Sequence, residues 1–303
     1  MTDVVLTGGT GMIGARLAEL LRAEGRALRW ITRDAARVAL RGSERAYSWN
    51  GTKVETAWLD GAGAVVHLAG EPIFGGLPTA ARRERIWSSR IDSTRSVVDA
   101  LAALPDASRP RVFVCASAVG YYADSGDDEI RESDPPGPGF ISELCRDWEA
   151  EAARARALGV RVCSLRIGVV LARSGGALGL MLPIFRAGLG GKLGDGRQWF
   201  PWIHLEDCAA LMQFALTSEA ASGAWNCTAP GSVRNAEFSA ALAKQLHRPA
   251  FFAVPAFAVR TALRDISTEL LASRRIVPAA AQSAGFTFRY PTLDAALSEI
   301  VAK

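Results

Sequence analysis

The first half of the chain alternates short apolar runs with segments whose apolar residues recur every three or four positions. Short β-branched runs predict strands covered on both faces, and the longer spacing predicts amphipathic helices. The predicted strands are residues 3–7, 28–32, 45–49, 64–68, 111–117 and 160–167. The predicted helices are residues 13–24, 79–104 and 141–158. This alternation predicts an α/β fold of the Rossmann type, a doubly wound parallel sheet with helices on both faces.

The second half has a different pattern. Glycine recurs densely between Ser174 and Gly196, which predicts mobile loops around a site rather than part of a core. The elements predicted after it are helices at 206–217, 235–246, 255–263 and 292–301, and a strand at 224–227. We therefore expect a dinucleotide-binding domain over residues 1–172 and a smaller substrate-binding or lid domain over residues 173–303, with an interleaved boundary.

Composition and charge narrow the class of protein. The longest uninterrupted apolar stretch, Ala250 to Val259, is well below the roughly 18 residues of a membrane-spanning helix. No basic segment followed by a long apolar one opens the chain, so we expect a cytoplasmic protein without a membrane partner. The five cysteines include no Cys-x-x-Cys pair and the three histidines no His-x-x-x-His pair, which favours a reducing compartment and no metal site.

The net charge of +4, from 35 basic and 31 acidic residues, is too small to indicate a nucleic-acid surface. The densest basic cluster has the spacing of a solvated helix face and comprises Arg82, Arg83, Arg85, Arg90 and Arg95. The acidic stretch from Asp124 to Asp134 is likewise expected to be a solvated loop. We expect a small-molecule substrate and no nucleic acid, with a homodimer as an open alternative to a monomer.

The strongest motif is Thr7-Gly8-Gly9-Thr10-Gly11-Met12-Ile13-Gly14, between the first predicted strand and the first predicted helix. Glycines at this spacing allow a tight turn, bring backbone amides close to a pyrophosphate and aim a helix N-terminus at its charge. The residues expected to hold a dinucleotide here are Gly8, Thr10, Gly11, Met12, Ile13 and Gly14.

The end of the second predicted strand distinguishes between the two nicotinamide dinucleotides. An acidic residue at this place usually holds the ribose 2′-hydroxyl of NAD, but this chain has Thr32-Arg33, with Asp34 one residue late. Arginine forms charge-assisted bonds with a 2′-phosphate. Thr32 and Arg33 therefore predict NADP(H) rather than NAD(H).

Further motifs follow the same strands. They are His67-Leu68-Ala69-Gly70, Ala116-Ser117-Ala118-Val119-Gly120-Tyr121-Tyr122, Glu132-Ser133-Asp134-Pro135-Pro136, Arg166-Ile167-Gly168-Val169-Val170-Leu171, and Gly194-Asp195-Gly196 leading to Trp202-Ile203-His204-Leu205-Glu206-Asp207. With the glycine turn, they resemble the extended, epimerase-like branch of the short-chain dehydrogenase/reductase superfamily. Ala284-Gly285-Phe286-Thr287-Phe288-Arg289-Tyr290 resembles the C-terminal domain of unknown function found in an atypical NAD-dependent epimerase/dehydratase-like subgroup.

The resemblance implies an NADP(H)-dependent oxidoreductase or epimerase-like protein acting on a small polar carbonyl or hydroxyl compound, with a nucleotide sugar as one candidate. It places His67, Leu68, Ala69, Gly70 and Arg166 along the cofactor. It gives Ser117 the role of orienting the reacting oxygen, with Tyr122 or Tyr121 as proton donor. Residues expected near the substrate are Glu71, Arg197, His204 and Arg234, although a structural role suits His204 better than acid catalysis.

The chain departs from the family at one decisive motif. Family members use a tyrosine as acid or base and a lysine four residues later that lowers its pKa and holds the nicotinamide ribose. No Tyr-x-x-x-Lys occurs here, and the helix that should carry it runs Phe140-Ile141-Ser142-Glu143-Leu144-Cys145. Glu143 and Cys145 are further candidates near the lost pair. The alternative function is therefore an NADPH-binding sensor or regulatory protein without turnover.

Overall fold

A seven-stranded sheet forms the centre of the protein. The computed structural model describes residues 3–74, 76 and 79–302. The strands lie in the order β12-β7-β5-β4-β1-β2-β3, and every neighbouring pair is parallel. Their bounds are β1 (Val4–Thr7), β2 (Leu28–Thr32), β3 (Arg45–Ser48), β4 (Ala64–His67), β5 (Val112–Ala118), β7 (Arg161–Ile167) and β12 (Gly223–Cys227). This topology confirms the predicted Rossmann-type α/β fold.

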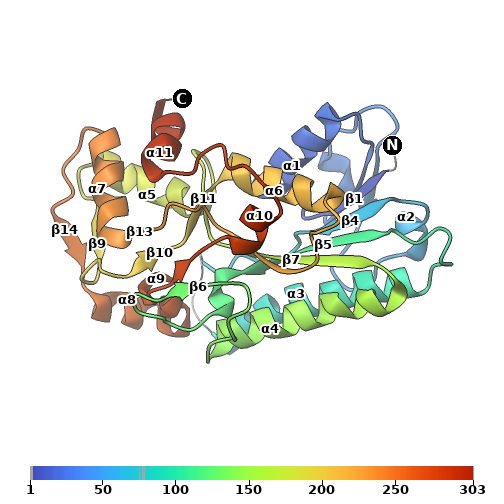
Figure 1. The fold of residues 1–303 in the computed structure, drawn as a ribbon, viewed down its shortest axis with the longest axis horizontal. Coiled ribbons are helices and arrows are strands. Elements are labelled where there is room, and N and C mark those ends of the chain that lie inside the picture. The colour runs from blue at the N-terminus through green and yellow to red at the C-terminus, as the bar shows by residue number, and fades with distance from the viewer. Residues whose placement is uncertain (1–2, 75, 77–78, 303) are drawn as a thin grey trace.

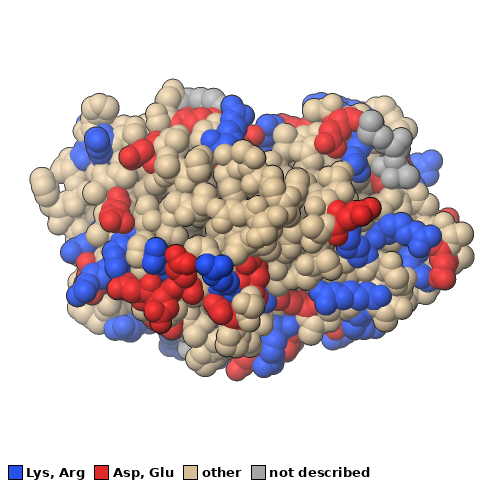
Figure 2. Space-filling model, in the orientation of Figure 1, with Lys and Arg blue, Asp and Glu red and all other residues tan. Residues whose placement is uncertain are grey.

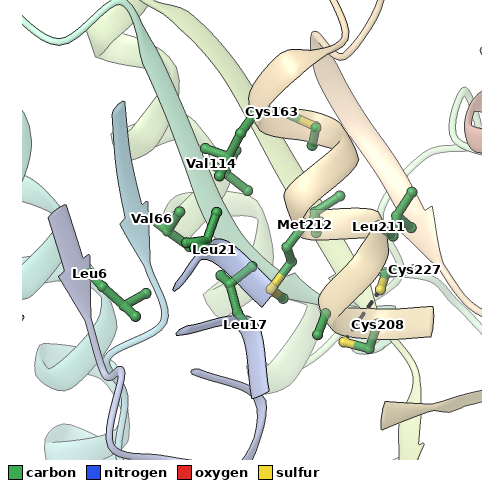
Figure 3. Close-up of a cluster of buried hydrophobic side chains, with 14 of the residues drawn as sticks. Leu6, Leu17, Leu21, Val66, Val114, Cys163, Cys208, Leu211, Met212 and Cys227 are labelled. Carbon is green, nitrogen blue, oxygen red and sulfur yellow. Dashed lines mark hydrogen bonds between the residues drawn. The ribbon is translucent and has the colours of Figure 1, made fainter. Parts of the chain in front are cut away.

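Helices cover both faces of this sheet (Figure 1). One face carries α1 (Met12–Ala23) and α6 (Leu205–Thr217), and the other carries α3 (Ala80–Ala102) and α4 (Phe140–Ala153). Because side chains alternate along a strand, Val4 and Leu6 pack under α1 and α6, whereas Val5 packs under α3 and α4. Figure 3 shows the first of these two cores, with leucines of α1 meeting the sheet and α6.

A smaller part follows the sheet along the chain. Its core lies between α5 (Gly176–Arg186), α7 (Asn235–Gln245) and α11 (Leu293–Ala302). Two short strand pairs join it to the rest, β8 (Val169–Leu171) with β11 (Trp202–His204) and β6 (Glu129–Ile130) with β15 (Arg275–Ile276). Two others lie within it, β9 (Gly191–Leu193) with β14 (Phe252–Val254) and β10 (Trp199–Phe200) with β13 (Val233–Arg234). The remaining helices are α2 (Thr56–Leu59), α8 (Ala256–Leu263), α9 (Thr268–Leu271) and α10 (Ala279–Ser283), with 3-10 turns η1 (Ala35–Arg37), η2 (Val119–Tyr121), η3 (Arg154–Leu158) and η4 (Arg264–Ser267).

The two parts interleave along the chain. Strand β12 and helix α6 complete the central sheet layer although both follow residue 172. The glycine-rich segment was expected to form loops, and this prediction is wrong for the stretch occupied by α5. Leu178, Leu182 and Phe185 of that helix are buried in the smaller core, because the glycines lie at its ends and between its apolar positions.

The arginine cluster of α3 is only partly solvated, which corrects the prediction. Arg85 and Arg95 are exposed, but Arg82 and Arg90 are each only 9% exposed. The guanidinium of Arg82 donates to the backbone carbonyl of Pro72 at 2.7 Å, so it fastens the loop before α3. Arg90 lies over the ring of Trp148 on α4.

The acidic stretch from Asp124 to Asp134 is also more than a solvated loop. Glu132 Oε1 accepts hydrogen bonds from the backbone amides of Asn226 and Ala280, at 3.1 and 3.0 Å. Asp127 forms a 2.8 Å ion pair with Arg234. Figure 2 shows acidic and basic side chains gathered together over β6 and β10. The stretch therefore joins the sheet domain to the C-terminal part.

Two further findings concern the chain as a whole. Among the described residues, no helix combines the length and apolar character needed to span a bilayer. All five cysteines are free thiols and all are buried.

Candidate functional site

The glycine turn joins β1 to α1 with backbone packed against backbone. Gly8 has φ of +65°, and a Cβ there would lie 2.6 Å from the carbonyl carbon of Leu68. A Cβ on Gly14 would lie 2.6 Å from the carbonyl oxygen of Gly8. These two approaches require glycine, and they bring the start of α1 against the end of β4. Gly11 caps α1 without any side-chain hydrogen bond, and the first turn contains no acidic residue.

This end of α1 therefore offers free backbone amides and a positive dipole end. Thr10 and Gly11 are exposed, and Met12 and Ile13 are half-buried. Such a terminus suits an anion such as a pyrophosphate. The residues of the turn fit the diphosphate of a dinucleotide.

His67 is the last residue of β4, and its side chain is buried rather than exposed at the glycine turn. Its ring is fully buried, with Nδ1 2.7 Å from Thr7 Oγ1 and Nε2 3.1 Å from Ser93 Oγ. Burial lowers the pKa of His67 to about 3, so the ring is neutral. Any contact of His67 with a ligand would come from its backbone, and the ring orders the ends of β1 and β4. Leu68 and Ala69 are half-buried beside it, and Gly70 is exposed.

The end of β2 presents a free arginine. Arg33 is exposed and forms no hydrogen bond or ion pair with any described residue, whereas Thr32 beside it is half-buried. Asp34 is already engaged, since its carboxylate accepts from the amide of Ala36 at 3.1 Å and pairs with Arg37 at 3.0 Å. The chain therefore holds its acidic residue against its own backbone and leaves the cation open.

Ser117, at the end of β5, belongs to a buried polar network. Its hydroxyl donates to Glu149 Oε1 at 2.6 Å. Glu149, on α4, receives two 2.8 Å bonds from the guanidinium of Arg166, which is 3% exposed. The same guanidinium donates to the hydroxyl of Tyr122 at 2.7 Å, and Tyr122 donates to Asn226 Oδ1 at 2.7 Å. The network links β5, α4, β7 and β12.

The two tyrosines after β5 are placed differently. Tyr122 is 2% exposed, and burial raises its pKa above the ordinary value despite the opposing effect of Arg166. Its hydroxyl already donates to Asn226 and accepts from Arg166, which argues against Tyr122 as proton donor to a substrate. Tyr121 is half-buried, with its ring 3.5 Å from the guanidinium carbon of Arg166. Arg166 is thus occupied by protein groups and does not offer its charge to a cofactor.

The first turns of α4 carry no tyrosine or lysine toward the site. Ile141 and Cys145 are buried on one face of the helix, and Glu143 is exposed. Burial raises the pKa of Cys145 to about 12, with the carboxylates of Glu269 and Glu149 adding to the rise and Arg90 opposing it. The thiol is therefore neutral, and the charged groups that act on it come from its own helix and from two other parts of the chain.

A cavity of about 540 Å³ opens between α4 and the C-terminal part. Its lining includes Gly120, Ile141, Glu269 and Arg274. Glu269 pairs with Arg274 at 3.1 Å, and a Cβ on Gly120 would lie 2.7 Å from its Oε2. The C-terminal part thus places a carboxylate beside Gly120, which follows Ser117 by three residues in the sequence. No sequence motif marks Glu269 or Glu149, because each reaches the site through contacts between residues that are far apart in the sequence.

The residues expected around a substrate do not form one cluster. His204 is 3% exposed, accepts the amide of Glu206 as the cap of α6, and contacts Glu299 at 3.2 Å. Its burial lowers its pKa, so His204 serves the packing of α6 and α11.

The other three expected substrate residues lie in two separate places. Arg234 pairs with Asp127 and donates to the carbonyl of Arg197, whose own side chain is exposed. Glu71 pairs with arginines of α3 at 3.5 and 3.6 Å. Of the four residues, only the exposed Arg197 side chain has no protein partner among the described residues.

Comparison with known proteins gives the family. Residues 4–228 match the model of the NAD dependent epimerase/dehydratase family. The chain belongs to this family. Residues 254–300 match a domain of unknown function, DUF1731, so the predicted family resemblance is confirmed in both parts.

Relatives of the epimerase family cover the whole chain. The chain is 39% identical to "Epimerase family protein SDR39U1" of Bos taurus, covering 99% of both chains. It is also 39% identical to "Epimerase family protein SDR39U1 homolog, chloroplastic" of Arabidopsis thaliana, covering 98% of this chain and 86% of the relative. The crystal structure of human epimerase family protein SDR39U1 (isoform 2) with NADPH superposes with a TM-score of 0.89 at 34% identity, covering 99% of both chains.

Proposed function

We propose that this epimerase-family protein binds NADP(H) in preference to NAD(H), along the edge of the sheet where its parallel strands end. The proposal rests on Arg33, which is exposed and has no hydrogen-bond or ion-pair partner among the described residues. The neighbouring carboxylate of Asp34 is already bonded to the amide of Ala36 and paired with Arg37. A guanidinium binds a 2′-phosphate, and a carboxylate held by its own backbone is poorly placed to accept from a 2′-hydroxyl. NADPH in the human relative supports the same preference.

The order of the strands supports a direction for the cofactor. Arg33 follows β2, the glycine turn follows β1, Gly70 lies beyond β4 and Ser117 ends β5. In open α/β sheets, ligands bind across the carboxyl ends of the strands where the strand order reverses, which is here between β1 and β4. The adenosine half then belongs at Arg33 and the reacting half at Ser117.

We further propose an oxidoreductase or epimerase-like activity on a small polar carbonyl or hydroxyl compound. The nicotinamide would supply or accept a hydride when bound. The Ser117 hydroxyl donates its hydrogen bond to Glu149, which is ion-paired with Arg166, so its oxygen is left to accept a hydrogen bond from a substrate hydroxyl. Tyr121, whose ring lies over the guanidinium of Arg166, is the candidate proton donor. The cavity beside Gly120, with its charged lining, is large enough for a small polar compound.

Turnover can be tested directly. The protein loaded with NADPH is mixed with a panel of carbonyl compounds, and single-turnover absorbance is followed at 340 nm. We expect at least one small polar carbonyl compound to oxidise the bound NADPH. The same experiment with Ser117→Ala should slow the oxidation without weakening NADPH binding.

The alternative function is a sensor or regulatory protein that binds NADPH without turnover. The observation that favours it is the occupation of the family's tyrosine and lysine helix by Ile141 and Cys145, both buried. NADPH that binds but is not oxidised by any member of the panel would favour the sensor and contradict the enzyme.

A further inference from the structure

Arg90 is a buried cation that forms no ion pair with a described residue. Its guanidinium donates two hydrogen bonds, from Nη1 to Ile86 O at 3.2 Å and to Ser89 Oγ at 3.4 Å. Burial lowers its pKa, and the carboxylate of Glu71, which pairs with Arg82 and Arg85, only partly opposes this. Buried charges are normally paired, because taking a charge out of water costs several kcal/mol. An arginine kept in this state is expected to find its remaining partners in a ligand.

The surroundings of Arg90 show where that ligand would lie. A Cβ on Gly70, the exposed residue after β4, would be 3.3 Å from the guanidinium carbon, so the cation packs directly against the backbone of this segment. Trp148 covers its other side, with the ring centre 5.2 Å away. Nε and Nη2 form no hydrogen bond with a described residue, and neither is among the fully buried atoms that lack a partner. These two nitrogens are therefore the ones that can donate to a ligand next to Gly70.

The same cation also lies against the helix on which the family carries its lysine. Arg90 belongs to α3, which packs against α4, and its guanidinium lies over Trp148 of α4. Arg90 also opposes the rise in the pKa of Cys145, which lies on α4 near the lost tyrosine and lysine pair.

We infer that Arg90 replaces the missing lysine and donates hydrogen bonds to the ribose of the nicotinamide half of NADP(H). This inference rests on the proposed function. The strand order supports it, because β4 lies between β1, which carries the pyrophosphate turn, and β5, which carries Ser117. Along the cofactor, the nicotinamide ribose lies between the pyrophosphate and the reacting nicotinamide ring. A cation on β4's side of the sheet edge, between β1 and β5, therefore lies at the level of this ribose. The planar guanidinium can address two neighbouring hydroxyls at once.

Three ligands that differ by one group each can test this assignment without any turnover. They are 2′-phospho-ADP, which ends at the pyrophosphate, 2′-phospho-ADP-ribose, which adds the second ribose, and NADPH. Dissociation constants are measured by quenching of tryptophan fluorescence for the wild type, Arg90→Met and Arg90→Lys. We expect Arg90→Met to raise the dissociation constants of 2′-phospho-ADP-ribose and NADPH about tenfold or more. The dissociation constant of 2′-phospho-ADP should change less than about twofold. Arg90→Lys should recover part of the loss.

Arg95→Met is the matched control, because Arg95 is an exposed arginine of the same helix. It should bind all three ligands as the wild type does. Equal losses for all three ligands in a folded Arg90→Met variant, or no loss for any, would overturn the role of Arg90. If the wild type binds none of the three ligands, the proposed NADP(H) function itself fails, which is a separate outcome. Arg90→Lys keeps the test valid if Arg90→Met does not fold.

Discussion

At the scale of single residues, Tyr122 separates a structural role from a catalytic one. Tyr122→Phe removes a hydroxyl that accepts from Arg166 and donates to Asn226, both within the buried network. Leaving these groups short of a partner should lower the free energy of unfolding by about 1–3 kcal/mol. Denaturant unfolding measures this loss. NADPH binding and any turnover should persist, and a stable variant that has lost all turnover would restore Tyr122 as the proton donor.

His67 makes a prediction about pH. Its pKa is about 3 in the folded protein, against an ordinary 6.5, because of burial. Between these values the unfolded chain binds a proton that the folded chain does not, so the stabilisation is complete above 6.5 and is lost as pH falls. The slope is up to about 1.4 kcal/mol per pH unit.

The measurement compares the free energy of unfolding at about pH 7 and about pH 5. His67→Gln should shrink the difference between the two values by about 2 kcal/mol. The exposed His247 gives the control, and His247→Asn should leave the difference unchanged because Asn tolerates the positive φ of 55° found there. An unchanged difference in His67→Gln would show that His67 is not held neutral.

At the scale of elements, the acidic segment before α4 holds the C-terminal part in place. Glu132→Ala would leave the backbone amides of Asn226 and Ala280 without their acceptor, and should cost about 1–3 kcal/mol in the free energy of unfolding. Asp128 lies in the same segment, is exposed and has no side-chain bond among the described residues. Asp128→Ala should therefore change little, and thermal unfolding of the two variants compares them. An equal effect of both substitutions would contradict the joining role.

The elements of the sheet domain follow from local patterns in the sequence, and several parts of the site do not. Apolar runs and helical spacing are local, so β1 to β5, β7 and the helices α1, α3 and α4 lie close to their predicted positions. The glycine turn is local too, because Gly8 and Gly14 contact each other within a few residues.

The network around Ser117 depends on contacts between distant residues. Glu149 is 32 residues from Ser117 and 17 from Arg166, and no short motif encodes these pairings. Arg90 was expected to be solvated because arginines on a polar helix usually are. Its burial follows from the packing of α4, whose Trp148 covers it.

At the scale of the whole molecule, these features share one edge of the sheet. The reversal of strand order between β1 and β4 brings a free arginine, an open helix N-terminus, a buried cation and a serine network to one edge of the sheet. The C-terminal part closes the far end with Glu269 and Arg274 around the cavity. The family membership is shown by the sequence match, and the preference for NADP(H) is the central claim about this chain.

The most direct measurement of that claim is the pair of dissociation constants for NADPH and NADH, in the wild type and in Arg33→Asp. We expect the wild type to bind NADPH more tightly than NADH. Arg33→Asp should weaken the binding of NADPH by about 10-fold to 100-fold and have little effect on the binding of NADH. Lys244→Asp, at an exposed position of α7, makes the same change of charge and should alter neither constant. Equal weakening of NADPH and NADH in a folded Arg33→Asp variant would contradict the assignment.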